Sequence, residues 1–434
     1  MISTKDFRSF GELLKQELIP ALGCTEPIAI ALACAMAREI LAEEPEQIKL
    51  YCSGNVIKNV KSVLVPNSGG RQGITIAAAL GVVVGEASRK LRILDGVTKE
   101  QQEEAVALAR SGRIQTELAE GRESLYILVE MKSTDQTASA ELNGNHTEFT
   151  RLMKNGVVTY QAENNESETA VSMEGLNIKN ILTYAAELEQ EKNEEISAVL
   201  RRQIAFNKAI AEEGLKGKYG AQVGKTILET EDREKPETLA KAWAAAGSDA
   251  RMSGCDLPVV INSGSGNQGL TVSLPVIIYG EYLETDETRL MSALAVANLV
   301  AIHQKSYIGK LSAFCGAVSA AAGAGAGIGW LLKLDYEQIS GIITNITAAT
   351  GGMLCDGAKP SCALKIAVAL NNVFLAVEMS KRGRVLSSGC GLVGRNVEET
   401  IQNVGYIART GLREADKEIL DLMLRSEAVC SREQ

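Results

Sequence analysis

A run of uncharged residues from Leu311 to Leu332 constrains the fold of this 434-residue chain more than any other feature. The run exceeds the ~18 residues that suffice for a membrane-spanning helix, but it consists mostly of alanine, glycine and serine, which gain little from lipid. Small residues also let neighbouring backbones approach closely. The run therefore predicts a tightly packed, buried helix.

The net charge of the chain restricts the classes of molecule that we expect it to bind. The chain has 45 Lys and Arg against 54 Asp and Glu, which gives a net charge of -9 and a pI near 5.2. Nucleic acids and acidic membrane surfaces require clustered positive charge, so we expect neither as a partner. A small amino-acid substrate is compatible, because a pocket can differ in charge from the whole protein. A homodimer is one assembly that the sequence permits.

The first residues and the cysteine content indicate a compartment. The segment MISTKDFRSFGELLKQELIP mixes acidic and basic residues and lacks the apolar core of a signal peptide. Nine cysteines, an odd number, are expected to be reduced thiols or metal ligands rather than disulfides. We therefore expect a cytoplasmic protein.

The pattern of apolar residues predicts an α+β (mixed α/β) fold that is rich in helices. Alternation from Leu125 to Gln161, with NGN and KNG as turns, predicts a small antiparallel sheet of three or four strands. Further strands are predicted around the Ser-Gly-Asn turn at 53–55. Helices are predicted over 7–43 with a break at GCTEP, from Gln72 in QGITIAAALGVVVG, over 101–118, over 176–253, and through most of the chain beyond Asp256.

These elements suggest two domains. Residues 1–170 are predicted to form an N-terminal α/β domain that contains the antiparallel sheet. Residues 171–434 are predicted to form a Gly/Ala-rich helical domain.

Three cysteines in the helical part, Cys315, Cys355 and Cys362, are candidate ligands of an iron-sulfur cluster. Cys355 and Cys362 form a Cys-x6-Cys pair in which glycines permit close approach to a cluster and Pro360 stiffens the loop. The spacing is neither that of ferredoxins nor the Cys-x2-Cys pairs of zinc ribbons. Three thiolates would leave one iron of a 4Fe-4S cluster open as a Lewis acid. Burial of the cysteines as small apolar residues is the alternative.

Cys24 directly precedes a predicted helix, in the segment GCTEP. The positive end of a helix dipole lowers the pKa of a thiol, which favours a thiolate that acts as base, nucleophile or ligand. A buried structural cysteine is the alternative.

The segment NSGSGNQG, from Asn262, is the clearest candidate for binding a small ligand. Its G-x-G-x-x-G pattern lacks surrounding βαβ units, so a dinucleotide site is not favoured. Backbone N–H groups and short polar side chains at a helix start suit a carboxylate. A structural turn and a nucleotide or pyridoxal phosphate site are alternatives. The candidate substrate-binding residues here are Asn262, Ser263, Ser265 and Asn267.

A second segment, VPNSGGRQGITIAAALGVVVG from Val65, resembles the segment VINSGSGNQGLTVSLPVIIYG from Val260. Each passes from an apolar strand through Asn-Ser-Gly and Gln-Gly into an uncharged helix. Two such loops are expected to face one site, which adds Asn67 and Ser68 as candidate substrate-binding residues. Chance similarity of Gly-rich loops is the alternative.

The chain contains two histidines, His146 and His303. So few histidines make a Ser-His-Asp triad or a multi-histidine metal site an unfavoured interpretation. His146 follows the NGN turn. We interpret it as a surface histidine, with reach into a pocket as the alternative.

Four segments together resemble the L-cysteine desulfidase family, oxygen-sensitive iron-sulfur lyases related to bacterial L-serine dehydratases. The segments are GCTEP, NSGSGNQG, CGAVSAAAGAGAG and GMLCDGAKPSCALK. The resemblance covers nearly the whole chain, including SDARMSG at 248–254 and the His-Thr pair at His146. One departure is NSGGRQG in the first loop, where a Gly-Thr-Gly type of sequence is expected.

The resemblance implies a 4Fe-4S cluster bound by Cys315, Cys355 and Cys362, with an open iron that takes the substrate. It implies that Cys24 is the base that removes the α-proton, with cluster ligation as the second choice. The N-terminal half then resembles the substrate-side domain and the helical half the catalytic domain.

The implied reaction is the β-elimination of L-cysteine to pyruvate, ammonia and hydrogen sulfide. An L-serine dehydratase with the same mechanism is the first alternative, because a β-hydroxyl and a β-thiol differ little in size. A pyridoxal phosphate-dependent lyase and a non-catalytic cluster-binding sensor are less favoured alternatives.

Overall fold

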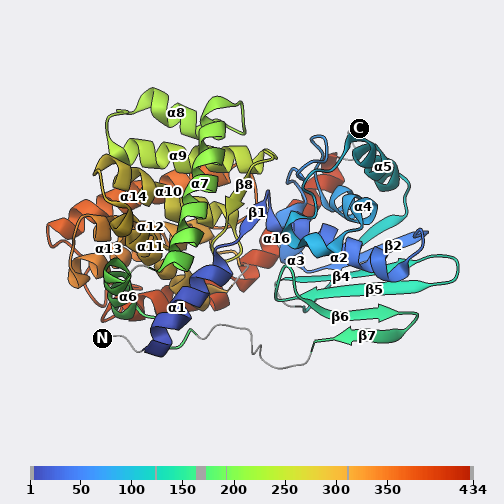
Figure 1. Ribbon diagram of the computed structural model, residues 1–434, viewed down its shortest axis with the longest axis horizontal. Helices are drawn as coiled ribbons and strands as arrows, with labels where there is room; N and C mark the ends of the chain where they lie inside the picture. Colours follow the sequence, from blue (N-terminus) through green and yellow to red (C-terminus); the bar gives the residue numbers. More distant parts are fainter. Residues whose placement is uncertain (1–3, 123–124, 163–172, 192, 310–311, 431–434) are drawn as a thin grey trace.

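A computed structural model describes residues 4–122, 125–162, 173–191, 193–309 and 312–430. The chain forms a helical body and an α/β body built on one main sheet (Figure 1). The prediction of a helix-rich α+β fold is confirmed. The predicted domain boundary near residue 170 lies outside the described residues.

The main sheet has the spatial order β3-β2-β4-β5-β6-β7. Only β2 and β3 pair in parallel, and the other neighbours are antiparallel. Alternation in β4 buries Ile127, Val129 and Met131 on the face that α2 covers. The predicted antiparallel strands correspond to β4–β7, and two strands from elsewhere enlarge the sheet. The strands are β2 (Gln47–Cys52), β3 (Ile114–Leu118), β4 (Tyr126–Lys132), β5 (Thr137–Asn143), β6 (Phe149–Lys154) and β7 (Val157–Gln161).

Two local predictions in this body are wrong. The segment after Ser53 is not a second strand but helix α3 (Gly54–Val60), in which Val56, Ile57 and Val60 are buried at helical spacing. The helix predicted over 101–118 ends earlier, and its last residues form β3. A parallel neighbour of β2 requires a crossover through helices, which local patterning does not reveal.

The helices of the α/β body pack closely because of small residues. An added Cβ at Gly81 of α4 would lie 2.1 Å from the carbonyl oxygen of Ala31 in α2. Only glycine therefore allows this approach of the two backbones. The helices are α2 (Thr25–Leu41), α4 (Ile74–Val84), the short η1 (Ala87–Arg92) and α5 (Lys99–Arg110).

Helix α12 (Gly316–Leu331) forms the centre of the helical body and confirms the buried helix predicted from the uncharged run. Added Cβ atoms at Gly323 and Gly327 would lie 2.4 Å and 2.9 Å from carbonyl oxygens of α11. The neighbouring helices are α6 (Ile178–Gln190), α7 (Glu194–Lys216), α8 (Val223–Thr230), α9 (Pro236–Met252), α10 (Gly266–Tyr282), α11 (Glu287–Ile308), α13 (Tyr336–Thr350), α14 (Cys362–Lys381), α15 (Val397–Tyr406) and η2 (Ile407–Gly411).

Among the described helices, only α14 is long and apolar enough to cross a membrane by length and composition. It packs against α9, α12 and α13.

Both ends of the chain connect the two bodies (Figure 1). Helix α1 (Thr4–Glu17) lies on the helical body, and β1 (Pro20–Leu22) then pairs antiparallel with β8 (Pro258–Val260). Helix α16 (Arg413–Cys430) leaves the helical body and packs on α3. These links hold the two bodies side by side.

Candidate active site

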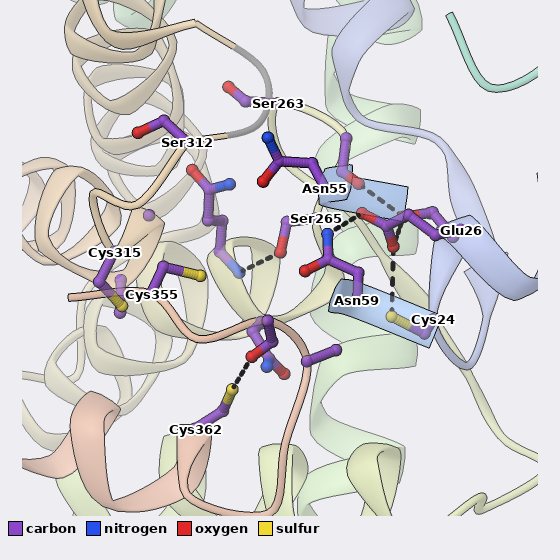
Figure 2. A pocket seen from close by; sticks show the side chains of 18 of the residues that line it. Cys24, Glu26, Asn55, Asn59, Ser263, Ser265, Ser312, Cys315, Cys355 and Cys362 are labelled. Atoms are coloured by element: carbon purple, nitrogen blue, oxygen red, sulfur yellow. Dashed lines mark hydrogen bonds between the residues drawn. The ribbon is translucent and has the colours of Figure 1, made fainter. Parts of the chain in front are cut away.

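A pocket of about 830 Å³, including solvent at its mouth, lies between the two bodies. Figure 2 shows three cysteines on one side of it and Cys24 with Glu26 on the other. The α/β body contributes Cys24, Thr25, Glu26, Asn55, Lys58, Asn59 and His146, and the helical body contributes Arg251, Ser263, Ser265, Asn267, Gln268, Lys305, Cys315, Cys355 and Cys362 among others.

A short backbone bridge positions Cys315 and Cys355. Phe314 and Leu354 form an antiparallel β-bridge between the loops that precede α12 and α14. The N–H of Cys315 donates to the loop opposite at 3.0 Å, and the N–H of Cys355 donates back at 2.6 Å. The two thiols are therefore held on paired loops.

Cys362 begins helix α14. Its Sγ accepts a hydrogen bond from the N–H of Lys359 at 3.5 Å and donates to the carbonyl oxygen of Gly357 at 3.7 Å. All three cysteines predicted as ligands thus line the same pocket.

The donor set fits an iron-sulfur cluster in type and number. Among the described residues, no three His, Cys, Asp or Glu side chains are grouped closely enough for one metal ion. A 4Fe-4S cluster does not need such a group, because each thiolate binds a different iron. Burial raises the pKa of Cys315 to about 12 and also raises the pKa of Cys362. Binding as thiolates would therefore release protons.

Cys24 is the N-cap residue of α2, at the helix start that the sequence predicted. Its buried Sγ donates a hydrogen bond to Oε2 of Glu26 at 3.3 Å. Burial and the charge of Glu26 raise the pKa of Cys24 well above its usual range, although Arg251 opposes them. The predicted lowering of this pKa by the helix dipole is wrong, because burial and the nearby carboxylate outweigh it.

Glu26 is held by neighbours within the α/β body, one of which also contacts the helical body. Its Oε1 accepts from Nδ2 of Asn59 at 2.9 Å, and its Oε2 accepts from Oγ1 of Thr25 at 3.1 Å. The same hydroxyl lies 3.0 Å from the carbonyl oxygen of Gly264. Burial would raise the pKa of Glu26, but His146, together with hydrogen bonds from the backbone and from Cys24, outweighs burial and lowers this pKa to about 2. Glu26 is therefore an ionised buried carboxylate at neutral pH.

The interpretation of His146 as a surface histidine is wrong. The residue follows β5, is 9 % exposed and lines the pocket, with Nε2 4.0 Å from Oε1 of Glu26. The turn in which it lies packs against Gly264 of the helical body. This contact joins distant segments, so the local sequence does not reveal it.

Ser263, Ser265 and Asn267 line the pocket, as the carboxylate hypothesis requires. Ser263 has a left-handed φ of 48°, and Ser265 caps α10. Asn262 instead lies behind the loop, where its Nδ2 donates to Oδ1 of Asn298 at 2.9 Å. It anchors the loop and does not line the pocket.

Asn67 and Ser68 do not line the pocket, so the expectation that both loops face one site is wrong. Nδ2 of Asn67 donates to the carbonyl oxygen of Leu94 at 2.8 Å. Oγ of Ser68 accepts from the N–H of Arg71 at 2.8 Å. The two segments share a sequence pattern, but only the segment from Val260 contributes side chains to the pocket.

Sequence reasoning missed the buried charged residues of the pocket. Glu26 and Arg251 lie in segments that carried the resemblance, GCTEP and SDARMSG, so they could have been singled out there. Lys305 had no such signal. Lys58 is, like Lys359 and Lys365, a possible substrate partner from the sequence, but lysine and arginine total 45 residues in this chain and no spacing singles one out.

Comparisons with known proteins identify the relatives of this chain. The family model described as the serine dehydratase alpha chain matches residues 88–421. A UPF0597 protein of Lachnoclostridium phytofermentans is 46 % identical over 96 % of this chain and 100 % of its own length. UPF0597 proteins of Desulfitobacterium hafniense and Finegoldia magna are 41 % and 42 % identical, each over 96 % of this chain and over 97 % and 99 % of their own lengths.

Proposed function

Because this chain belongs to the serine dehydratase alpha chain family, we propose that it is an L-cysteine desulfidase. The reaction converts L-cysteine and water to pyruvate, ammonia and hydrogen sulfide. The observation that carries the proposal is the single pocket in which Cys315, Cys355 and Cys362 face the Cys24–Glu26 pair.

Cys315, Cys355 and Cys362 would hold a 4Fe-4S cluster. When bound, such a cluster with one iron free of protein ligands supplies a Lewis acid for the departing β-substituent. The backbone bridge between the loops of Cys315 and Cys355, and the position of Cys362 at the start of α14, support this assignment. Burial lowers the pKa of Lys305 to about 8, and negative charge on Cys355 and Cys315 would oppose this lowering and favour the protonated amine.

The Cys24–Glu26 pair would take the α-proton. The pair holds one proton, on Cys24, and one negative charge, on Glu26. As Cys24 accepts the α-proton, its own proton passes to Glu26, so the pair gains one proton in total. The high pKa of Cys24 and the low pKa of Glu26 both oppose passage of a proton from the thiol to the carboxylate in the free pocket. Bound positive charge must therefore lower the pKa of Cys24, as Arg251 already does in part.

Loss of the α-proton and of the β-thiol leaves 2-aminoacrylate. This product tautomerises to an imine, and water hydrolyses the imine to pyruvate and ammonia. The sulfur leaves as sulfide and takes up protons to give hydrogen sulfide. The reaction involves no net oxidation or reduction.

L-Serine dehydratase activity is the second candidate, because the matching family model carries that description. The same residues would act, and water would leave in place of hydrogen sulfide. The two candidates differ only in the β-substituent.

The test is an anaerobic assay of the purified protein with L-cysteine and with L-serine. Higher kcat/KM for sulfide and pyruvate release from L-cysteine supports the desulfidase, and faster pyruvate release from L-serine supports the dehydratase. A protein that retains iron but turns over neither substrate contradicts both. Activity abolished by hydroxylamine, in a protein without iron, indicates pyridoxal phosphate instead.

Matched variants test the residue roles. Cys355→Ala should lose most of its iron, whereas Cys24→Ala should retain iron and lose turnover. Cys390 is exposed and outside the pocket, so Cys390→Ala should retain both. Unchanged iron content in Cys355→Ala contradicts the ligand assignment.

A further inference from the structure

Two buried cations in the pocket have no acidic partner among the described residues. The side chains of Arg251 and Lys305 line the pocket and are 3 % and 6 % exposed. Neither forms an ion pair or a side-chain hydrogen bond within the described part of the chain, and Nε of Arg251 is a buried donor without an acceptor. Lys58, by contrast, pairs with Asp416. Buried charges normally have partners, so Arg251 and Lys305 indicate that the pocket receives anions.

The two cations come from different helices of the helical body. Lys305 lies in the last turn of α11, which packs against α12, the helix that Cys315 caps. Arg251 lies in the last turn of α9 and lines the same pocket as Cys24 and Cys362. An anion bound at Arg251 would therefore share the pocket with the proposed base and the proposed cluster.

Arg251 also lies directly against the first turn of α10. An added Cβ at Gly266 would lie 2.3 Å from Nε of Arg251. Glycine at this position thus leaves room for the guanidinium beside the helix start. Figure 2 shows Ser265, the N-cap of α10, between the three cysteines and the Cys24–Glu26 pair. Backbone N–H groups at a helix start and a guanidinium together form a strong carboxylate site.

The same turn offers a buried acceptor without a donor. Oε1 of Gln268 has no hydrogen-bond partner among the described residues, and the side chain is 4 % exposed and lines the pocket. Its amide group packs against Gly316, next to Cys315. An unpaired donor and an unpaired acceptor therefore flank one helix turn. An α-amino acid has the complementary pair, a carboxylate that accepts and an ammonium that donates.

We propose that the first turn of α10 recognises a zwitterionic α-amino acid, with Arg251 binding the α-carboxylate and Oε1 of Gln268 accepting from the α-ammonium. The inference rests on the proposed function for the identity of the reactive substrate. The recognition itself does not depend on turnover. It would leave the β-substituent, whether thiol or hydroxyl, to be selected elsewhere in the pocket.

Three unreactive probes test this recognition by ligand-observed NMR titration of the anaerobically purified protein. L-Alanine carries both groups, propionate carries only the carboxylate, and L-alaninamide carries only the ammonium. Wild type should bind L-alanine most tightly. Arg251→Gln should weaken the binding of L-alanine and of propionate by roughly 100-fold, because a charge-assisted bidentate contact is lost. The binding of L-alaninamide should not change.

Gln268→Leu should weaken the binding of L-alanine and of L-alaninamide by roughly tenfold and leave the binding of propionate unchanged. Arg202→Gln is the matched control, because Arg202 is partly buried and also has an unpartnered Nε but lies outside the pocket. Arg251→Lys keeps the charge without the planar fork and should bind L-alanine with intermediate affinity. It replaces Arg251→Gln if that variant does not fold.

Equal binding of L-alanine by wild type and the Arg251 variants overturns the inference, as does a wild type that binds L-alanine no better than L-alaninamide. A wild type that shows the expected preferences but releases no pyruvate supports the recognition and contradicts the proposed function. The two failures are therefore distinguishable.

Discussion

Replacing Asp416 with alanine should leave a buried lysine without its carboxylate. Lys58 of α3 is 2 % exposed and pairs with Asp416 of α16, whose side chain is 18 % exposed. Nζ of Lys58 has one further contact, at 3.4 Å, with the carbonyl oxygen of Cys355. The second oxygen of Asp416 accepts from Asn55 at 2.6 Å. The pair thus connects the C-terminal helix, the α/β body and a proposed ligand loop.

The expected cost follows from this burial. Removing one partner of a buried ion pair typically costs roughly 3 to 5 kcal/mol. Because water reaches the edge of this pair at Asp416, we expect about 3 kcal/mol for Asp416→Ala. Lys58→Met should cost less, about 1 to 2 kcal/mol, since Asp416 keeps Asn55 and some solvent. The double variant should lose about 2 kcal/mol less than the sum of the two single losses, because no unpaired charge remains.

Urea unfolding of the anaerobically purified protein measures these free energies. The matched control is Lys417→Ala, because Lys417 pairs with Glu414 on the same helix with side chains 70 % and 79 % exposed. That variant should lose less than about 0.5 kcal/mol. The reasoning is refuted if Asp416→Ala loses less than about 1 kcal/mol, or if the two single losses simply add. Iron content should also fall in Asp416→Ala, because Lys58 no longer holds the Cys355 loop.

Three further perturbations test separate parts of the structure. Burial raises the pKa of Asp249 from 3.8 to about 6. Between about pH 4 and 6 the folded protein therefore keeps a proton on Asp249 that the unfolded chain has lost, and the free energy of unfolding should fall by about 3 kcal/mol as pH rises through this range. Asp249→Asn should flatten this pH dependence in urea titrations. Gly81→Ala should destabilise by at least about 2 kcal/mol through overpacking, whereas Gly352→Ala, with nothing within 4 Å of an added Cβ, should cost less than about 0.5 kcal/mol. Burial is the larger cause of the raised pKa of Cys24, and the charge of Glu26 is the next. Glu26→Gln should therefore lower the pKa of Cys24 and speed its labelling by iodoacetamide roughly tenfold. An unchanged labelling rate would contradict the interaction of Cys24 with Glu26.

The sequence predicted the elements whose patterns are local. The uncharged run from Leu311 gave a buried helix, and the alternation from Leu125 gave antiparallel strands. Local patterns failed where long-range pairing decided the outcome. The residues of β3 read as the end of a helix, yet they pair in parallel with β2, from which α3, α4, η1 and α5 separate them along the chain. Hydrogen bonds between distant segments leave little trace in a short window of sequence.

The candidate site divides in the same way. Residue types and spacing alone indicated Cys315, Cys355 and Cys362, the thiol at the helix start, and the Ser and Asn residues before α10. Tertiary structure decided that these segments meet in one pocket, that burial and Glu26 raise the pKa of Cys24, and that Asn67 and Ser68 lie elsewhere. It also buried Arg251 and Lys305 without acidic partners. The physical reason is that a side chain carries its chemistry in its own atoms, whereas its burial, charge partners and pKa depend on groups that only the folded chain brings near it.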